Sequence, residues 1–281
     1  MSKHIIYLIL ILIFLTLYLK YKYENYPELF EQQKNAVCFI IRNLNDITLE
    51  FAEECAMYSD VYIIVDDNKQ KIKLKKGKVK ILQINNDLCK KNNYIKSTWR
   101  FNEDVTGWDK AFYYFCENNN YDNVWFIEDD VFVPTADTFV KIDQKYGKVD
   151  FLCNLFNYVY PKSTNPNNAW KEKLFDGHKY MNHTNLHWTW VCAMRCSKKL
   201  LSDIKKIKKD RGELFFHEIL IATIVKNNNL TYKKIPELQN IIYRKIYKSE
   251  DIVKNDTLLY HPIKDYNEQN RLRQLIKNKL K

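Results

Sequence analysis

The stretch "DNVWFIEDDVFVP", Asp122 to Pro134, joins an apolar run to three consecutive carboxylates. Residues 123–127 have the pattern of a buried strand. They lead directly into Glu128, Asp129 and Asp130, after which hydrophobic residues resume. Adjacent acids repel one another and lose hydration where a strand meets its loop, so such a cluster needs a favourable partner. The stretch therefore predicts a covered strand whose end carries a functional acidic group.

Similar apolar runs recur along the chain and alternate with helical patterns. The runs predicted as strands are 36–41, 61–67, 79–84, 150–156 and 188–197, and the predicted helices include 46–59, 106–119 and 213–227. Alternation of this kind is typical of a mostly parallel sheet with helices on both faces. We therefore predict an α/β fold of the Rossmann type, with a mostly parallel central sheet flanked by helices.

A second pair of acids, Asp66 and Asp67, ends the strand predicted at 61–67. Because ligands of such sheets bind outside the carboxyl ends of the strands, both acid clusters are expected to share one crevice. In the extended chain Glu128 and Asp130 would point to one face and Asp129 to the other. The five glycines are not clustered, so there is no P-loop and no dinucleotide fingerprint. A divalent cation, Mg²⁺ or Mn²⁺, is the other means of holding a diphosphate on carboxylates.

Four segments resemble, in this order, the motifs of GT-A-fold glycosyltransferases, the nucleotide-sugar-dependent class with a DxD-type metal motif. They are "VYIIVDD" (61–67), "WFIEDDV" (125–131), "FFHEILIATIV" (215–225) and "LLYHPIKD" (258–265). The metal motif is an EDD variant, so which acids touch the metal stays open. The resemblance implies a GT-A-like fold and a Mn²⁺ or Mg²⁺ cofactor. It also implies transfer of a sugar from a UDP- or GDP-sugar donor to a glycan or glycoprotein acceptor.

The resemblance implies roles for single residues. Asp130 and His261 would bind the metal, and Glu218 would be the catalytic base of an inverting reaction. The residues expected to contact the nucleotide sugar are Arg42, Asn43, Asp66, Asp67, Lys110, Glu128 and Asp129. Those expected to stack on an acceptor sugar are Trp170, Trp188 and Trp190.

Each of these roles has a structural alternative that the sequence leaves open. Glu218 would otherwise be an acid on a helix surface, His261 a structural histidine, and Lys110 a solvated lysine. The three tryptophans would otherwise be core residues.

The N-terminal segment holds 15 uncharged residues, Ile5 to Leu19, flanked by Lys3, Lys20 and Lys22. We interpret residues 1–23 as a transmembrane signal anchor, which predicts a single-pass type II membrane protein. Its location would be the Golgi or ER lumen in a cell, or a host membrane for a viral product. The remaining predicted parts are a stem (24–35), a nucleotide-sugar-binding half (36–156), an acceptor-binding half (157–262) and a basic helical tail (263–281).

The net charge of +11 reflects either A/T-rich coding or an anionic partner. Two other functions stay open. One is a membrane-tethered protein that binds nucleic acid or anionic lipid through residues 69–80 and the tail. The other is a metal-dependent nucleotidyltransferase or phosphohydrolase that uses the same acids. Under the main interpretation, the glycosyltransferase, we expect no nucleic acid partner. The seven cysteines include no CxxC pair, so they do not indicate a structural zinc site.

Overall fold

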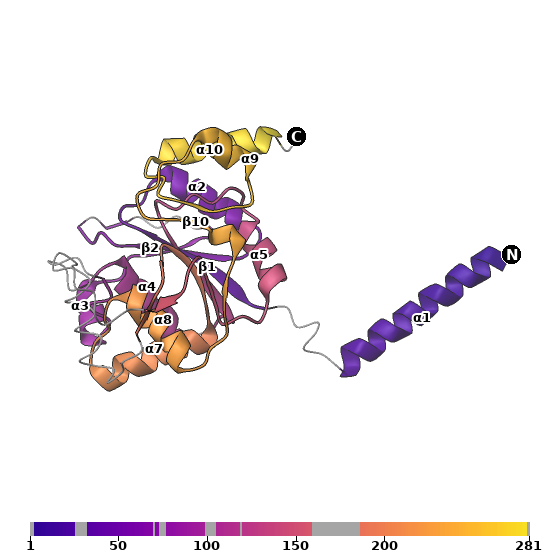
Figure 1. The fold of residues 1–281 in the computed structure, drawn as a ribbon, viewed down its shortest axis with the longest axis horizontal. Helices are drawn as coiled ribbons and strands as arrows, with labels where there is room; N and C mark the ends of the chain where they lie inside the picture. Colours follow the sequence, from indigo (N-terminus) through magenta and orange to yellow (C-terminus); the bar gives the residue numbers. More distant parts are fainter. Residues whose placement is uncertain are drawn as a thin grey trace. The chain divides into compact units, whose positions relative to one another are not determined.

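The computed structural model describes residues 3–25, 33–69, 71–72, 77–98, 105–118, 120–158 and 186–279. The chain divides into two compact units, Met1–Lys34 and Asn35–Lys281. The first unit contains helix α1, Lys3–Asn25, and the second contains all the other elements (Figure 1).

Helix α1 corrects the expectation of a membrane anchor. Over the described residues, no helix combines the length and the apolar character that crossing a membrane requires. The uncharged run of 15 residues forms about 22 Å of helix, whereas a hydrocarbon core is about 30 Å thick. The predictions of a transmembrane helix, of type II topology and of a Golgi, ER or host-membrane location are therefore wrong.

The described residues of the second unit form a seven-stranded sheet with the order β3-β2-β1-β4-β8-β5-β9. Strands β3, β2, β1 and β4 are parallel, β8 is antiparallel to both of its neighbours, and β9 is parallel to β5. The fold is thus α/β with a mostly parallel sheet. The strands are β1 Asn35–Ile41, β2 Asp60–Val65, β3 Lys80–Leu82, β4 Asn123–Glu128, β5 Phe151–Cys153, β8 Ala193–Ser197 and β9 Tyr232–Lys234.

Helices cover both faces of this sheet. Successive strand residues point to opposite faces, and they belong to two different hydrophobic clusters. In β1, Cys38 and Ile40 belong to one cluster and Val37 and Phe39 to the other. Helices α3 (Asn86–Lys91), α4 (Gly107–Glu117), α7 (Lys198–Arg211) and α8 (His217–Asn227) contribute to the first cluster. Helices α2 (Asp46–Cys55) and α5 (Thr138–Tyr146) contribute to the second (Figure 1).

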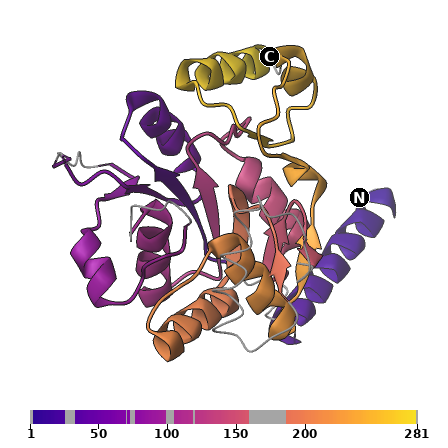
Figure 2. The ribbon, with the colours of Figure 1, turned by 60° about the vertical axis from the view of Figure 1, so that its left-hand side comes forward.

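A third cluster joins the C-terminal segment to the chain that follows β4. It contains Phe132, Ile252, Tyr260, Leu272 and Ile276. The elements involved are α9 (Ser249–Lys254), β11 (Tyr260–His261) and α10 (Tyr266–Lys279); Figure 2 shows α9 and α10 side by side. Strand β11 also pairs with β10 (Asn240–Ile241). The segment predicted as a basic tail is therefore mostly a packed helix.

The remaining described elements are short: β6 (Asn157–Tyr158) pairs with β7 (His187–Trp188), and a 3-10 helix, η2, spans Pro236–Leu238. Strands β8 and β9 of the predicted acceptor-binding half belong to the same sheet as β1 to β5. All seven cysteines are free and buried. Trp170 and parts of the basic stretch 69–80 lie outside the described residues.

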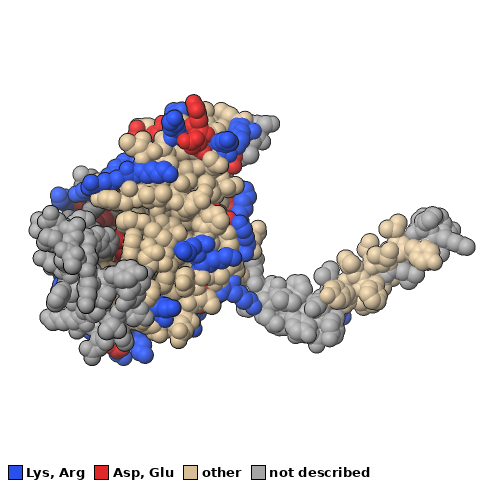
Figure 3. All heavy atoms as spheres, in the orientation of Figure 1, with Lys and Arg blue, Asp and Glu red and all other residues tan. Residues whose placement is uncertain are grey.

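Charged side chains of the second unit are dispersed over the face shown in Figure 3, where basic residues occur at several separate places. Acids accompany the basic residues of α10. Arg271 pairs with Glu268 at 2.7 Å, and Lys279 pairs with Asp256 at 2.8 Å. These pairs reduce the net positive charge that the C-terminal segment presents.

Candidate functional site

A cavity of about 790 Å³ lies at the carboxyl ends of β1, β2 and β4. Parallel strands present their ends together at this edge, which is where α/β sheets bind ligands. The cavity is also bordered by the start of α4, the start of α8, the loop before β8 and the C-terminal segment. The predicted site residues that line it are Arg42, Asp66, Glu128, Asp129, Asp130, Trp190, Glu218 and His261.

Asp129 lies in the turn after β4 and is held by other parts of the chain. Its carboxylate accepts hydrogen bonds from the Tyr266 hydroxyl at 2.8 Å and from the Arg42 backbone N–H at 3.3 Å. Its carbonyl accepts a bond of 2.9 Å from the side-chain amide of Gln269. Helix α10 therefore fixes the turn that carries the acids, and Asp130 is left to meet His261.

His261 reaches this turn because β11 is bound to the segment after β4. The Ile263 N–H donates to the carbonyl of Asp130 at 2.7 Å. Nδ1 of the imidazole lies 3.2 Å from the carbonyl of Ile242 and donates to it when that nitrogen carries the hydrogen. Nε2 then faces Oδ1 of Asp130 at 3.3 Å. The structure thus brings together the two residues that were expected to hold a metal.

The contact between His261 and Asp130 requires a positive species. With Nδ1 as the donor, Nε2 and the carboxylate are both acceptors, so they repel unless a proton or a cation lies between them. Burial alone would lower the pKa of His261, but the hydrogen bond and charge of Asp130 and the charge of Glu128 raise it. Burial and the charge of Asp130 raise the pKa of Glu128. A divalent cation fits this donor set of carboxylates and imidazole.

Glu128 is connected to helix α8 through two aromatic rings. Its Oε1 accepts a hydrogen bond of 2.7 Å from the indole N–H of Trp108. The Trp108 ring stacks on His217, with 4.8 Å between centroids and 25° between planes. The backbone N–H of His217 donates to the carbonyl of Ser97 at 2.7 Å, and its Nδ1 contacts the same carbonyl. These contacts hold the Glu128 carboxylate in one orientation.

Glu218 is the second residue of α8 and is only 8% exposed. Its Oε2 makes no hydrogen bond with any described residue. Burial, and then the charge of Glu128, raise its pKa from 4.5 to about 9. A carboxyl group with this pKa holds a proton at neutral pH, so it would serve as a general base only when a bound cation or ligand lowers the pKa.

Lys110, near the start of α4, is buried and pairs with Asp66, which follows β2 and is partly exposed. The ammonium of Lys110 is fully buried, 2.8 Å from Oδ1 of Asp66, and it also contacts the Asp66 carbonyl. Lys110, which was expected to contact the nucleotide sugar, does not line the cavity but holds Asp66, which does. Asn43 and Asp67 also lie outside the cavity lining. Gly107 lines the cavity, and a Cβ there would lie 2.7 Å from a side-chain carbon of Ile40.

Trp190 forms an aromatic wall together with a residue that the sequence did not indicate. Its ring stacks on Tyr243 with 5.9 Å between centroids and 15° between planes. Trp188 does not line the cavity but packs edge-on against Trp190 at 5.2 Å. Trp170, the third predicted tryptophan, lies outside the described residues.

Several lining residues escaped the sequence analysis. Lys264 is part of the motif "LLYHPIKD" and Tyr266 follows it directly, so proximity to His261 was a usable signal. Trp108 and Cys192 had none, because nothing in the sequence indicates which apolar residue will face a cavity. The lining residues missed are Ile40, Ile41, Thr98, Thr106, Gly107, Trp108, Cys192, Phe216, His217, Tyr243, Lys264 and Tyr266.

Comparison of the chain with protein-family models and with curated proteins finds no match. The geometry of the cavity therefore carries the functional argument.

Proposed function

We propose that this chain is a metal-dependent glycosyltransferase. It moves a sugar from a nucleoside-diphosphate sugar, linked to UDP or GDP, to a hydroxyl group of a glycan or glycoprotein acceptor. One observation carries the proposal. Asp130 and His261, far apart in the sequence, meet at 3.3 Å in the cavity that also holds the buried carboxyl of Glu218.

Asp130 and His261 would hold the cation, Mn²⁺ or Mg²⁺, with Glu128 beside them. When bound there, the cation supplies Lewis acidity that neutralises the charge growing on a diphosphate leaving group. The contacts of Tyr266 and Gln269 with Asp129 keep the acidic turn in place before any ligand arrives. Such preorganisation reduces the rearrangement that ligand binding requires.

The nucleotide would occupy the side of the cavity formed by the ends of β1 and β2. Asp66 lines this side and is held in place by Lys110, so its other oxygen is available for a sugar or ribose hydroxyl. Gly107 has no side chain, which allows the start of α4 to approach Ile40 and Asp66 closely. The helix N-terminus also favours a negatively charged group.

Glu218 would act as the base. The acceptor hydroxyl would donate a hydrogen bond to Oε2, and its proton would move to that oxygen as the hydroxyl oxygen attacks the anomeric carbon. Attack opposite the leaving group would invert the anomeric centre. Because the charge of Glu128 contributes to the raised pKa of Glu218, neutralising that charge would favour the ionised form that a base needs.

Binding experiments with the full chain test this proposal. UDP, GDP and their sugars are titrated into the protein with Mn²⁺ and with EDTA. We expect binding only with Mn²⁺, and we expect its loss in Asp130→Ala and in His261→Ala. Glu250→Ala, an exposed acid of α9, is the matched control. Absent binding, or binding that ignores the metal, contradicts the proposal.

The catalytic assignment has a separate test. Glu218→Gln should abolish sugar transfer while leaving Mn²⁺-dependent donor binding intact, because the amide keeps the shape but cannot accept the proton. Transfer that survives this change shows that another group is the base. Nucleotide turnover that needs no acceptor would instead favour a phosphohydrolase.

A further inference from the structure

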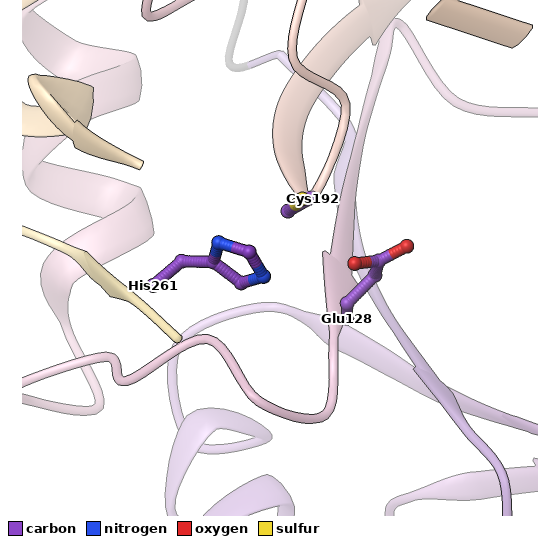
Figure 4. A group of neighbouring side chains, drawn as sticks. All are labelled: Glu128, Cys192 and His261. Carbon is purple, nitrogen blue, oxygen red and sulfur yellow. The ribbon is translucent and has the colours of Figure 1, made fainter. Parts of the chain in front are cut away.

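The cavity contains a sulfur atom at the point where the metal ligands meet. One donor atom each from Glu128, Cys192 and His261 lie within 4.8 Å of one another. Figure 4 shows the three side chains converging from the end of β4, from the loop before β8 and from β11. Among the described residues, no other trio of histidine, cysteine and acidic side chains meets this distance.

The backbone fixes Cys192 beside Glu128. Strand β8 pairs antiparallel with β4, so Ala193 lies opposite Ile127, and the Glu128 N–H donates to the carbonyl of Cys192 at 2.8 Å. His261 is 8% exposed and Cys192 9% exposed. The thiol is thus held by the sheet at a mostly covered position and is not carried on a free loop.

We propose that this cavity binds a thiophilic divalent cation, Zn²⁺ in particular, through Sγ of Cys192, Nε2 of His261 and a carboxylate oxygen of Glu128. Asp130, whose Oδ1 lies 3.3 Å from Nε2 of His261, supplies a fourth donor. The consequence for the enzyme rests on the proposed function, because Zn²⁺ would compete there with the catalytic cation.

The donor distances suit a tetrahedral ion after a small contraction. Zinc binds sulfur at about 2.3 Å and imidazole nitrogen at about 2.0 Å, which places neighbouring donors roughly 3.5 Å apart. The present donor atoms lie within 4.8 Å of one another, so binding would draw them together by roughly 1 Å. Nδ1 of His261 already meets the Ile242 carbonyl, the kind of outer contact that orients metal-bound histidines.

The sulfur decides which ion the site prefers. Mn²⁺ and Mg²⁺ favour oxygen donors, whereas Zn²⁺ binds a thiolate well. A given site with nitrogen, oxygen and sulfur donors also generally binds Zn²⁺ more tightly than Mn²⁺. Binding releases the thiol proton to solvent as the metal–sulfur bond forms. Zn²⁺ should therefore bind more tightly than Mn²⁺ and displace it.

The experiment uses the full chain, stripped of metal. Zn²⁺ affinity is measured by competition with a chromophoric chelator, and Cd²⁺ is added to record the ultraviolet charge-transfer band of a metal–thiolate bond. We expect the band in the wild type and its loss in Cys192→Ser. We also expect Zn²⁺ affinity to fall more than about 100-fold, since even outer contacts of metal ligands contribute 10- to 100-fold. Mn²⁺ affinity should change little.

The matched control is Cys196→Ser, a buried cysteine of β8 in the first hydrophobic cluster, which should keep both the band and the affinity. A wild type without the band, or a band that persists in Cys192→Ser, overturns the inference. If Cys192→Ser does not fold, His261→Ala replaces it, and retained Zn²⁺ affinity there is equally decisive against the site. A Cd²⁺ band without any nucleotide binding would refute the proposed function and leave the zinc site standing.

Discussion

Replacing Glu218 with Gln should make the protein more stable at alkaline pH. The carboxyl group is 8% exposed, and burial followed by the charge of Glu128 raises its pKa from 4.5 to about 9. A group whose pKa is raised on folding stabilises the folded state fully below its unfolded pKa. That contribution is lost as the pH rises from about 4.5 towards about 9.

The size of the effect follows from linkage. Within this interval the folded chain holds a proton that the unfolded chain has released, so each pH unit removes about 1.4 kcal/mol of unfolding free energy. Between pH 5.5 and pH 8.0 the wild type should lose about 3 kcal/mol through this residue alone. Gln has no proton to lose. The stability of Glu218→Gln relative to the wild type should therefore rise by about 3 kcal/mol over the same range.

Urea unfolding at the two pH values, with EDTA present, measures this difference. Other buried groups titrate nearby, including Asp109, whose pKa burial raises to about 6, but they cancel when the variant is compared with the wild type. Glu250→Gln, on the exposed side of α9, should show no pH-dependent difference. A Glu218→Gln advantage that is the same at both pH values would refute the protonated, buried carboxyl.

Three further substitutions test other parts of the site and its support. Tyr266→Phe removes the 2.8 Å hydrogen bond to the Asp129 carboxylate. Mn²⁺-dependent nucleotide affinity should fall roughly 5-fold, because a lost hydrogen bond costs about 1 kcal/mol. Unchanged affinity in a titration contradicts the role given to α10. Arg195→Leu removes the buried guanidinium that lies 2.8 Å from the Asp143 carboxylate. The unfolding free energy should drop by about 3 to 5 kcal/mol, because the buried charge of Asp143 is left unpaired. A drop of less than 1 kcal/mol in urea unfolding contradicts this role of the ion pair. Gly107→Ala places a methyl group 2.7 Å from a side-chain carbon of Ile40 in β1. We expect this overpacking to lower the unfolding free energy by about 1 to 3 kcal/mol. An unchanged midpoint of thermal unfolding would show that Ile40 moves aside without cost.

The sequence was informative where a residue's role depends on a regular pattern. The apolar runs at 36–41 and 61–67 lie on β1 and β2. Asp66 after β2 reaches the same cavity as the acids 128–130 at the end of β4, because parallel strands end together. The alternation expected of an extended chain does not apply to the acids themselves, because Asp129 and Asp130 lie in the turn after β4 and all three acids line the cavity.

The sequence was uninformative where a role depends on tertiary contacts. Lys110 has the appearance of a solvated helix lysine, yet it is fully buried against Asp66. Helix α10 has basic residues typical of a surface tail, yet Arg273 is buried with its guanidinium 3.7 Å from the centre of the Phe51 ring. Cys192 became a metal-ligand candidate only through the pairing of β8 with β4, a contact between segments far apart in the chain.

The three adjacent acids are tolerated because each has a different partner. Glu128 accepts from the Trp108 indole, Asp129 from the Tyr266 hydroxyl, and Asp130 faces His261. The first two partners are neutral donors, so they orient the carboxylates without cancelling their charge. His261 is the partner that gains charge only by binding a proton, and a metal ion would take that proton's place. The negative charge of the three acids is therefore left uncancelled until a proton or a metal ion binds at Asp130 and His261. This charge favours the binding of a cation in the cavity.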